Sequence, residues 1–114
     1  MKKVLIAICL FMLVLSQGVF AHSPSRIDLD YNPQTSILSV VVFHNVTDPE
    51  NHYVAKVTVA INGKSLIEDV RTVQDDKDKQ TIKYRLPELK KGDSVTVEAS
   101  CSIQGTHSAL LELE

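Results

Sequence analysis

Residues 53–70 read YVAKVTVAINGKSLIEDV, and this stretch indicates the fold class. Apolar and polar side chains alternate along its first half, which is typical of a strand with one buried face. Asn62-Gly63 then interrupts the pattern, and both residue types tolerate the positive φ angles of a two-residue turn. KSLIEDV follows as a return strand, so the stretch predicts a β-hairpin. We expect its inward face to carry Tyr53, Ala55, Val57, Val59 and Ile61.

The same period of two recurs on both sides of the hairpin. The other expected strands are RIDLDY (26–31), SILSVVVF (36–43), TIKYRLP (81–87), SVTVEAS (94–100) and HSALLELE (107–114). The second of these is apolar enough to be buried on both faces. No segment favours a helix, and there is no internal repeat. We therefore predict an all-β fold, an immunoglobulin-like antiparallel β-sandwich of about seven strands that forms one domain over residues 22–114.

Residues 1–21 have the layout of a secretory signal peptide. Two lysines form the charged start, an apolar run covers residues 4–15, and Ala21 is a small residue at the expected cleavage point. The apolar run is shorter than the about 20 residues that cross a bilayer, so a retained membrane anchor is not expected. The mature chain is then exported, to the periplasm or outside the cell, and begins at His22.

Charge and cysteine content narrow the function classes. Cleavage removes two lysines and no acidic residue, which changes the formal net charge from −2 to about −4. Nucleic acid is therefore not an expected partner, because phosphate binding needs clustered Lys and Arg. The polar run QDDKDKQ, residues 74–80, is interpreted as a solvated loop. Cys101 is the one cysteine left after cleavage, so no internal disulfide is expected, and an exported lone thiol has to be buried, paired or metal-bound.

Several side chains at the edges of the expected strands could ligate a metal ion. The candidates are His22, His44, His52 and Cys101. Imidazole nitrogen and thiolate sulfur suit iron, copper and zinc, whereas calcium and magnesium prefer oxygen. If these edges meet at one end of a sandwich, the four donors gather there.

A structural interpretation competes with the metal site. Cys101 continues the inward parity of its strand, and buried cysteine is common. His22 could be a disordered terminus, and the two loop histidines could bond backbone groups. Spacing alone favours this interpretation, because no compact ligand motif such as CxxC is present. His107, at the start of the last strand, is expected to have a surface role.

The order of the candidates resembles a known family. HNVTDPENHYV (44–54) resembles the segment of the desulfoferrodoxin and superoxide reductase iron-binding domain in which two histidines flank a short loop. KKGDSVTVEASCSIQG (90–105) resembles the ending of that domain, where a cysteine in a turn follows a strand. His22-Ser-Pro resembles its early histidine. The resemblance covers most of residues 22–114.

The resemblance implies a mononuclear non-haem iron centre on a seven-stranded sandwich. His44 and His52 match equatorial ligands, Cys101 matches the axial thiolate, and His22 matches the early ligand. The implied activity is that of an oxidoreductase that reduces superoxide and receives electrons from a donor protein. Gln104 stands where the family has its last histidine, and the family's Glu-Lys before the early histidine has no counterpart here.

Two other functions stay open. If His22 is the mature terminus, its α-amine and Nδ1 could chelate copper together with His44 or His52, with Cys101 adding sulfur. This is the donor set of a periplasmic copper carrier. The other alternative is an immunoglobulin-like module that binds a protein partner and needs no metal.

Overall fold

The computed structural model describes residues 22–114, and this part of the chain forms seven strands and no helix. They are β1 (Arg26–Asn32), β2 (Ile37–Phe43), β3 (Val54–Ile61), β4 (Lys64–Val70), β5 (Lys79–Arg85), β6 (Ser94–Cys101) and β7 (Thr106–Glu112). The expected signal peptide, residues 1–21, lies outside the described residues. Within residues 22–114 no helix is long and apolar enough to span a bilayer.

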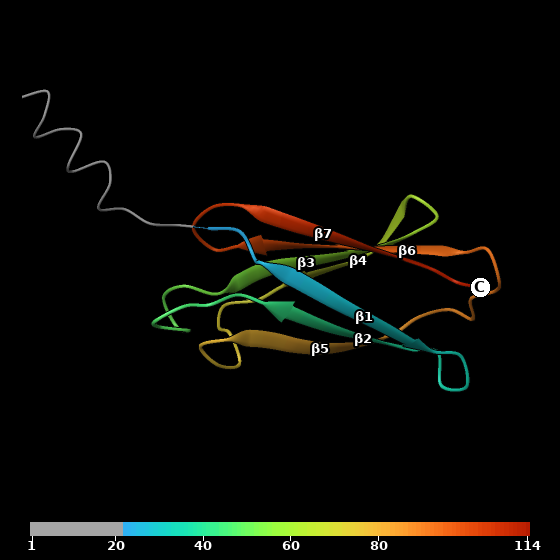
Figure 1. Cartoon of the computed structure of the whole chain (residues 1–114), viewed down its shortest axis with the longest axis horizontal. Coiled ribbons are helices and arrows are strands. Elements are labelled where there is room, and N and C mark those ends of the chain that lie inside the picture. Colours follow the sequence, from blue (N-terminus) through green and yellow to red (C-terminus); the bar gives the residue numbers. More distant parts are fainter. Residues whose placement is uncertain (1–21) are drawn as a thin grey trace, which may run out of the picture.

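The strands form two antiparallel sheets. One has the order β1-β2-β5 and the other the order β4-β3-β6-β7 (Figure 1). Their inner faces share one apolar core. The prediction of an all-β chain with about seven antiparallel strands is confirmed, and two such sheets with a shared core are consistent with a β-sandwich. The immunoglobulin-like connectivity stays a prediction.

Alternating residues of the central strands fill the core. The fully buried members in β2 and β6 are Leu38, Val40, Val42, Val95, Val97 and Ala99. β2 was expected to be buried on both faces, but its other face is only partly covered. That face lies on the outside of its sheet, where neighbouring side chains cover it in part. The guanidinium carbon of Arg26, for example, lies 4.3 Å from the Phe43 ring centroid.

An irregularity at the start of β3 changes which residues face inward. The register with β6 shifts between Val54, opposite Cys101, and Lys56, opposite Ser100. An extra residue at such a bulge breaks the alternation of side chains. Val54 is therefore fully buried, while Tyr53 and Ala55, which were expected inside, are only partly covered.

The Asn62-Gly63 turn agrees with the sequence. Asn62 has φ of 52° and Gly63 has φ of 82°, as a two-residue hairpin requires. The turn belongs to the hairpin pole, the end of the molecule formed by residues 33–36, 62–63 and 86–93. The opposite end, the histidine pole, is formed by residues 22–25, 44–53, 71–78 and 102–105.

Candidate metal site

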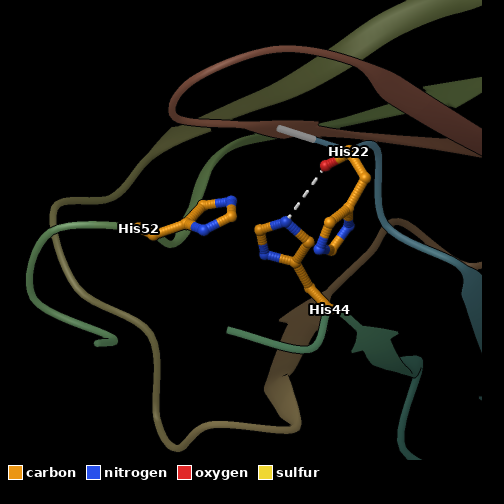
Figure 2. A group of neighbouring side chains, drawn as sticks. All are labelled: His22, His44 and His52. Atoms are coloured by element: carbon orange, nitrogen blue, oxygen red, sulfur yellow. Dashed lines mark hydrogen bonds between the residues drawn. The ribbon is translucent and has the colours of Figure 1, made fainter. Parts of the chain in front are cut away.

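Three histidines from separate segments meet at the histidine pole. His22 lies before β1, His44 follows β2 directly, and His52 lies two residues before β3. Their rings point toward one another (Figure 2), and one nitrogen from each lies within 4.8 Å of the other two. Ring centroids are 4.8–5.6 Å apart. An ion about 2.0–2.1 Å from each nitrogen needs the nitrogens about 3.3 Å apart, so small side-chain rotations would close the site.

His44 is fully buried, and a glutamine holds its ring. Gln74 Oε1 lies 2.9 Å from His44 Nδ1 and 3.2 Å from the Val54 backbone nitrogen. Gln74 Nε2 donates to the carbonyl oxygens of His44, at 2.7 Å, and Asp76, at 2.8 Å. These contacts fix the ring in place, as the partners of metal-binding histidines commonly do.

The other ring nitrogen of His44 faces a backbone oxygen. His44 Nε2 lies 3.3 Å from the carbonyl oxygen of His22, the contact that is dashed in Figure 2. When Nδ1 carries the proton of the neutral ring, Nε2 and this oxygen are both acceptors. They need a proton or a metal ion between them.

The segment that carries His22 is docked on the domain. Pro24 is fully buried, and the Ser25 backbone nitrogen donates to the Phe43 carbonyl at 2.8 Å. Gly105 packs directly against this segment, because a Cβ at this position would lie 2.8 Å from the backbone nitrogen of Ser23. His22 Nδ1 lies 3.1 Å from the Ser23 carbonyl, which leaves its Nε2 available as a donor. The docking of this segment therefore holds the His22 side chain at the site.

His52 is positioned by the loop that precedes it. Its backbone nitrogen donates to the Asp48 carbonyl at 2.9 Å, and the Asp48 carboxylate accepts the Glu50 N–H at 3.1 Å. Burial lowers the pKa of His52, and the like charges of His44 and His22 lower it further. His52 therefore favours the neutral form, which is the form that binds a metal.

Cys101 lies beside this cluster. It is 8% exposed, and its Sγ lies 3.1 Å from His52 Nε2 and 3.4 Å from the Ile103 backbone nitrogen. In the tetrahedral geometry that gives about 3.3 Å between nitrogens, bonds of about 2.0 Å to nitrogen and 2.3 Å to sulfur place these two donors about 3.5 Å apart, so the 3.1 Å contact is that of a hydrogen bond and the sulfur is near enough to reach an ion. Cys101 is outside the set of three mutually close donors and adjoins it through His52. Its role as a ligand stays a prediction.

Two other residues weighed from the sequence are outside the three-histidine set. Gln104 is an exposed residue of the β6–β7 turn. His107 pairs with Ala99 in β7 and is half-buried, with the same inward parity as Ala109 and Leu111. His107 is therefore partly covered, and its expected surface role stays a prediction.

Sequence reasoning missed Gln74 and Gly105. The run of residues 74–80 was interpreted as a solvated loop, yet Gln74 is 2% and Gln80 is 1% exposed. Gln80 shares the inward parity of Ile82 and Tyr84, and this parity could have revealed it. No local pattern marks Gln74, because its partners lie 20 and 30 residues away along the chain.

A cavity of about 330 Å³ adjoins the histidines. It is lined by His22, Asn45, Val46, Thr47 and His52. A small ligand can therefore approach two of the three imidazoles from solvent.

Comparison of the chain with family models, with curated proteins and with solved structures finds no significant match.

Proposed function

We propose that this protein is an exported metal-binding protein that holds one transition-metal ion between His22, His44 and His52. The observation that carries the proposal is the approach of three ring nitrogens to within 4.8 Å of one another. Hydrogen bonds to backbone groups explain why a single histidine is buried. They do not explain why three, which repel one another when protonated, share one pole.

Iron is the metal we propose, with Cys101 as the fourth donor. Imidazole suits iron, copper and zinc, and a thiolate beside it gives a mixed nitrogen and sulfur set. The resemblance to the desulfoferrodoxin and superoxide reductase domain supports iron, with superoxide reduction as the reaction and a separate protein as electron donor. The ion would supply the redox chemistry. The chain would supply the donors, their orientation and the cavity beside His22 and His52.

Copper is the second candidate. The mutually close donors are all imidazoles, and nitrogen-rich sites bind Cu(II) more tightly than other first-row divalent ions. If the mature chain begins at His22, the docking of residues 22–25 would also bring its α-amine near the site. In this case the protein would carry copper and would not turn over superoxide.

Metal analysis of the protein exported with its own leader tests the proposal. We expect about one iron per chain and a visible thiolate-to-iron band that disappears in Cys101→Ser. Tight copper, weakened when one residue is added before His22, would support the carrier. If neither iron, copper nor zinc binds after reconstitution, the metal proposal is wrong and the interaction module is left. His107→Ala is the matched control, because it removes a histidine outside the set.

A further inference from the structure

Gln74 makes more contacts at the site than its place in a polar loop suggests. It lies between β4 and β5 and is 2% exposed. Its side chain bonds His44 twice, at Nδ1 and at the carbonyl oxygen, and also bonds the backbone of Val54 and Asp76. Its own backbone nitrogen donates to the Pro49 carbonyl at 3.1 Å. One residue thus braces the loop that carries both His44 and His52.

The contacts allow one orientation of the amide. Nε2 can only donate, and it faces two carbonyl oxygens, at 2.7 and 2.8 Å. Oε1 can only accept, and it faces the N–H of Val54. Turning the amide over would place oxygen against two oxygens and N–H against N–H. Oε1 is therefore the atom that meets His44 Nδ1, and Nδ1 has to carry a proton.

We propose that Gln74 is a positioning residue of the metal site, which sets the tautomer of His44 so that Nε2 is the ligating nitrogen. The inference rests on the proposed function. A ring fixed as Nδ1–H presents an unprotonated Nε2 at a set angle, whereas a ring without this acceptor divides between two tautomers. Loss of such a partner typically lowers metal affinity by about 10- to 100-fold.

Two substitutions distinguish an effect on the His44 tautomer from a general loss of the hydrogen bonds that brace the loop. Gln74→Met removes every side-chain hydrogen bond. Gln74→Glu keeps an acceptor for His44 Nδ1 and for Val54 N–H, but loses the two donors. Gln80→Met is the matched control, because Gln80 is equally buried in the same segment and bonds Asp75 and Thr81 instead of a histidine.

The first readout is the protonation of His44 in the metal-free protein, from long-range ¹⁵N–¹H NMR above the imidazole titration range. We expect Nδ1–H in the wild type, in Gln80→Met and in Gln74→Glu, and a mixture or Nε2–H in Gln74→Met. An unprotonated Nδ1 in the wild type would overturn the proposal, even if no variant folds.

The second readout is affinity for Fe(II), titrated without oxygen, with Zn(II) as a redox-inert check. We expect a loss of about 10- to 100-fold for Gln74→Met, no loss for Gln80→Met, and a smaller loss for Gln74→Glu than for Gln74→Met, because Glu keeps the acceptor for His44 Nδ1 but not the two donors. Equal affinities of wild type and Gln74→Met would overturn the inference and leave the metal site standing. A wild type that binds neither of these ions nor Cu(II) would instead refute the proposed function.

Discussion

The two poles of the molecule differ in how polar side chains at strand ends are satisfied. At the hairpin pole, Asn62 donates to the Asp93 carboxylate at 3.0 Å and accepts the Ser94 N–H at 2.9 Å, and Asp93 also accepts the Lys90 N–H at 2.8 Å. Each of these three donors meets an acceptor. The backbone N–H of Lys90 lowers the pKa of Asp93 most, and the bond from Asn62 adds to this, so the carboxylate stays charged.

The histidine pole instead gathers ring nitrogens, whose donor or acceptor roles depend on the tautomer of each ring. His44 Nε2 faces a carbonyl oxygen, His52 Nε2 faces a sulfur, and the rings of His22, His44 and His52 face one another. Burial and neighbouring charge lower the pKa of His52, which opposes filling this space with protons. The hairpin pole is therefore satisfied by protein groups alone, whereas the three histidines of the other pole could hold a cation.

Removal of His44 should have the largest effect on metal affinity. His44→Ala deletes the buried donor of the site, so we expect metal affinity to fall by more than about 100-fold. Titration of wild type and variant with Fe(II) or Cu(II) measures the change. An equal loss of metal affinity in His107→Ala would show that binding is not specific to His22, His44 and His52.

The contact between Gly105 and the segment that carries His22 gives the next test. Gly105 has φ of 97°, and its added Cβ would meet the Ser23 backbone, whereas Gly63, with φ of 82°, has nothing within 4 Å of the same position. We expect both alanine variants to lose about 1–2 kcal/mol from the unfavourable φ. Gly105→Ala should in addition displace His22 and weaken metal binding by about tenfold. Equal affinities in the two variants would contradict the docking of residues 22–25.

A change at the hairpin pole should affect stability without affecting the metal. Asn62→Gly keeps a residue suited to the φ of 52° and removes the bonds to Asp93 and Ser94. We expect a loss of about 1–2 kcal/mol in unfolding free energy by urea denaturation. Metal affinity in the folded variant should equal that of the wild type, and a decrease would mean that the two poles are coupled.

The pH dependence of the metal-free protein should be the smallest effect. Folding lowers the pKa of His52, so the unfolding free energy is larger at neutral pH than at low pH. The contribution of His52 is therefore complete above the ordinary imidazole pKa of about 6.5 and is lost as pH falls through the lower folded value. Urea titrations from about pH 7.5 to 5 should show this decline, and it should flatten in His52→Gln. A rise in stability on acidification would mean that protons, rather than a metal, suit the cluster.

The fold was largely predictable because its causes are local. Alternation along β1, β5 and β6 and the Asn62-Gly63 turn are visible in the residues themselves. The bulge at the start of β3 was not, because a register shift depends on pairing with β6 and leaves no mark on the hydrophobic pattern.

The site was predictable in part for the same reason. His44 and His52 were identified because each lies at the edge of an expected strand, and their approach follows from the antiparallel layout. Gln74 and Gly105 were not, since a buried amide bonding three groups 20 and 30 residues away and a glycine next to the Ser23 backbone depend on tertiary contacts.

X-ray absorption at the metal edge of the loaded protein tests the central claim most directly. We expect about three imidazole nitrogens at about 2.0–2.2 Å, with one sulfur near about 2.3 Å that is lost in Cys101→Ser. An ion surrounded by oxygen alone, with no imidazole scattering and no response to His44→Ala, would contradict the account.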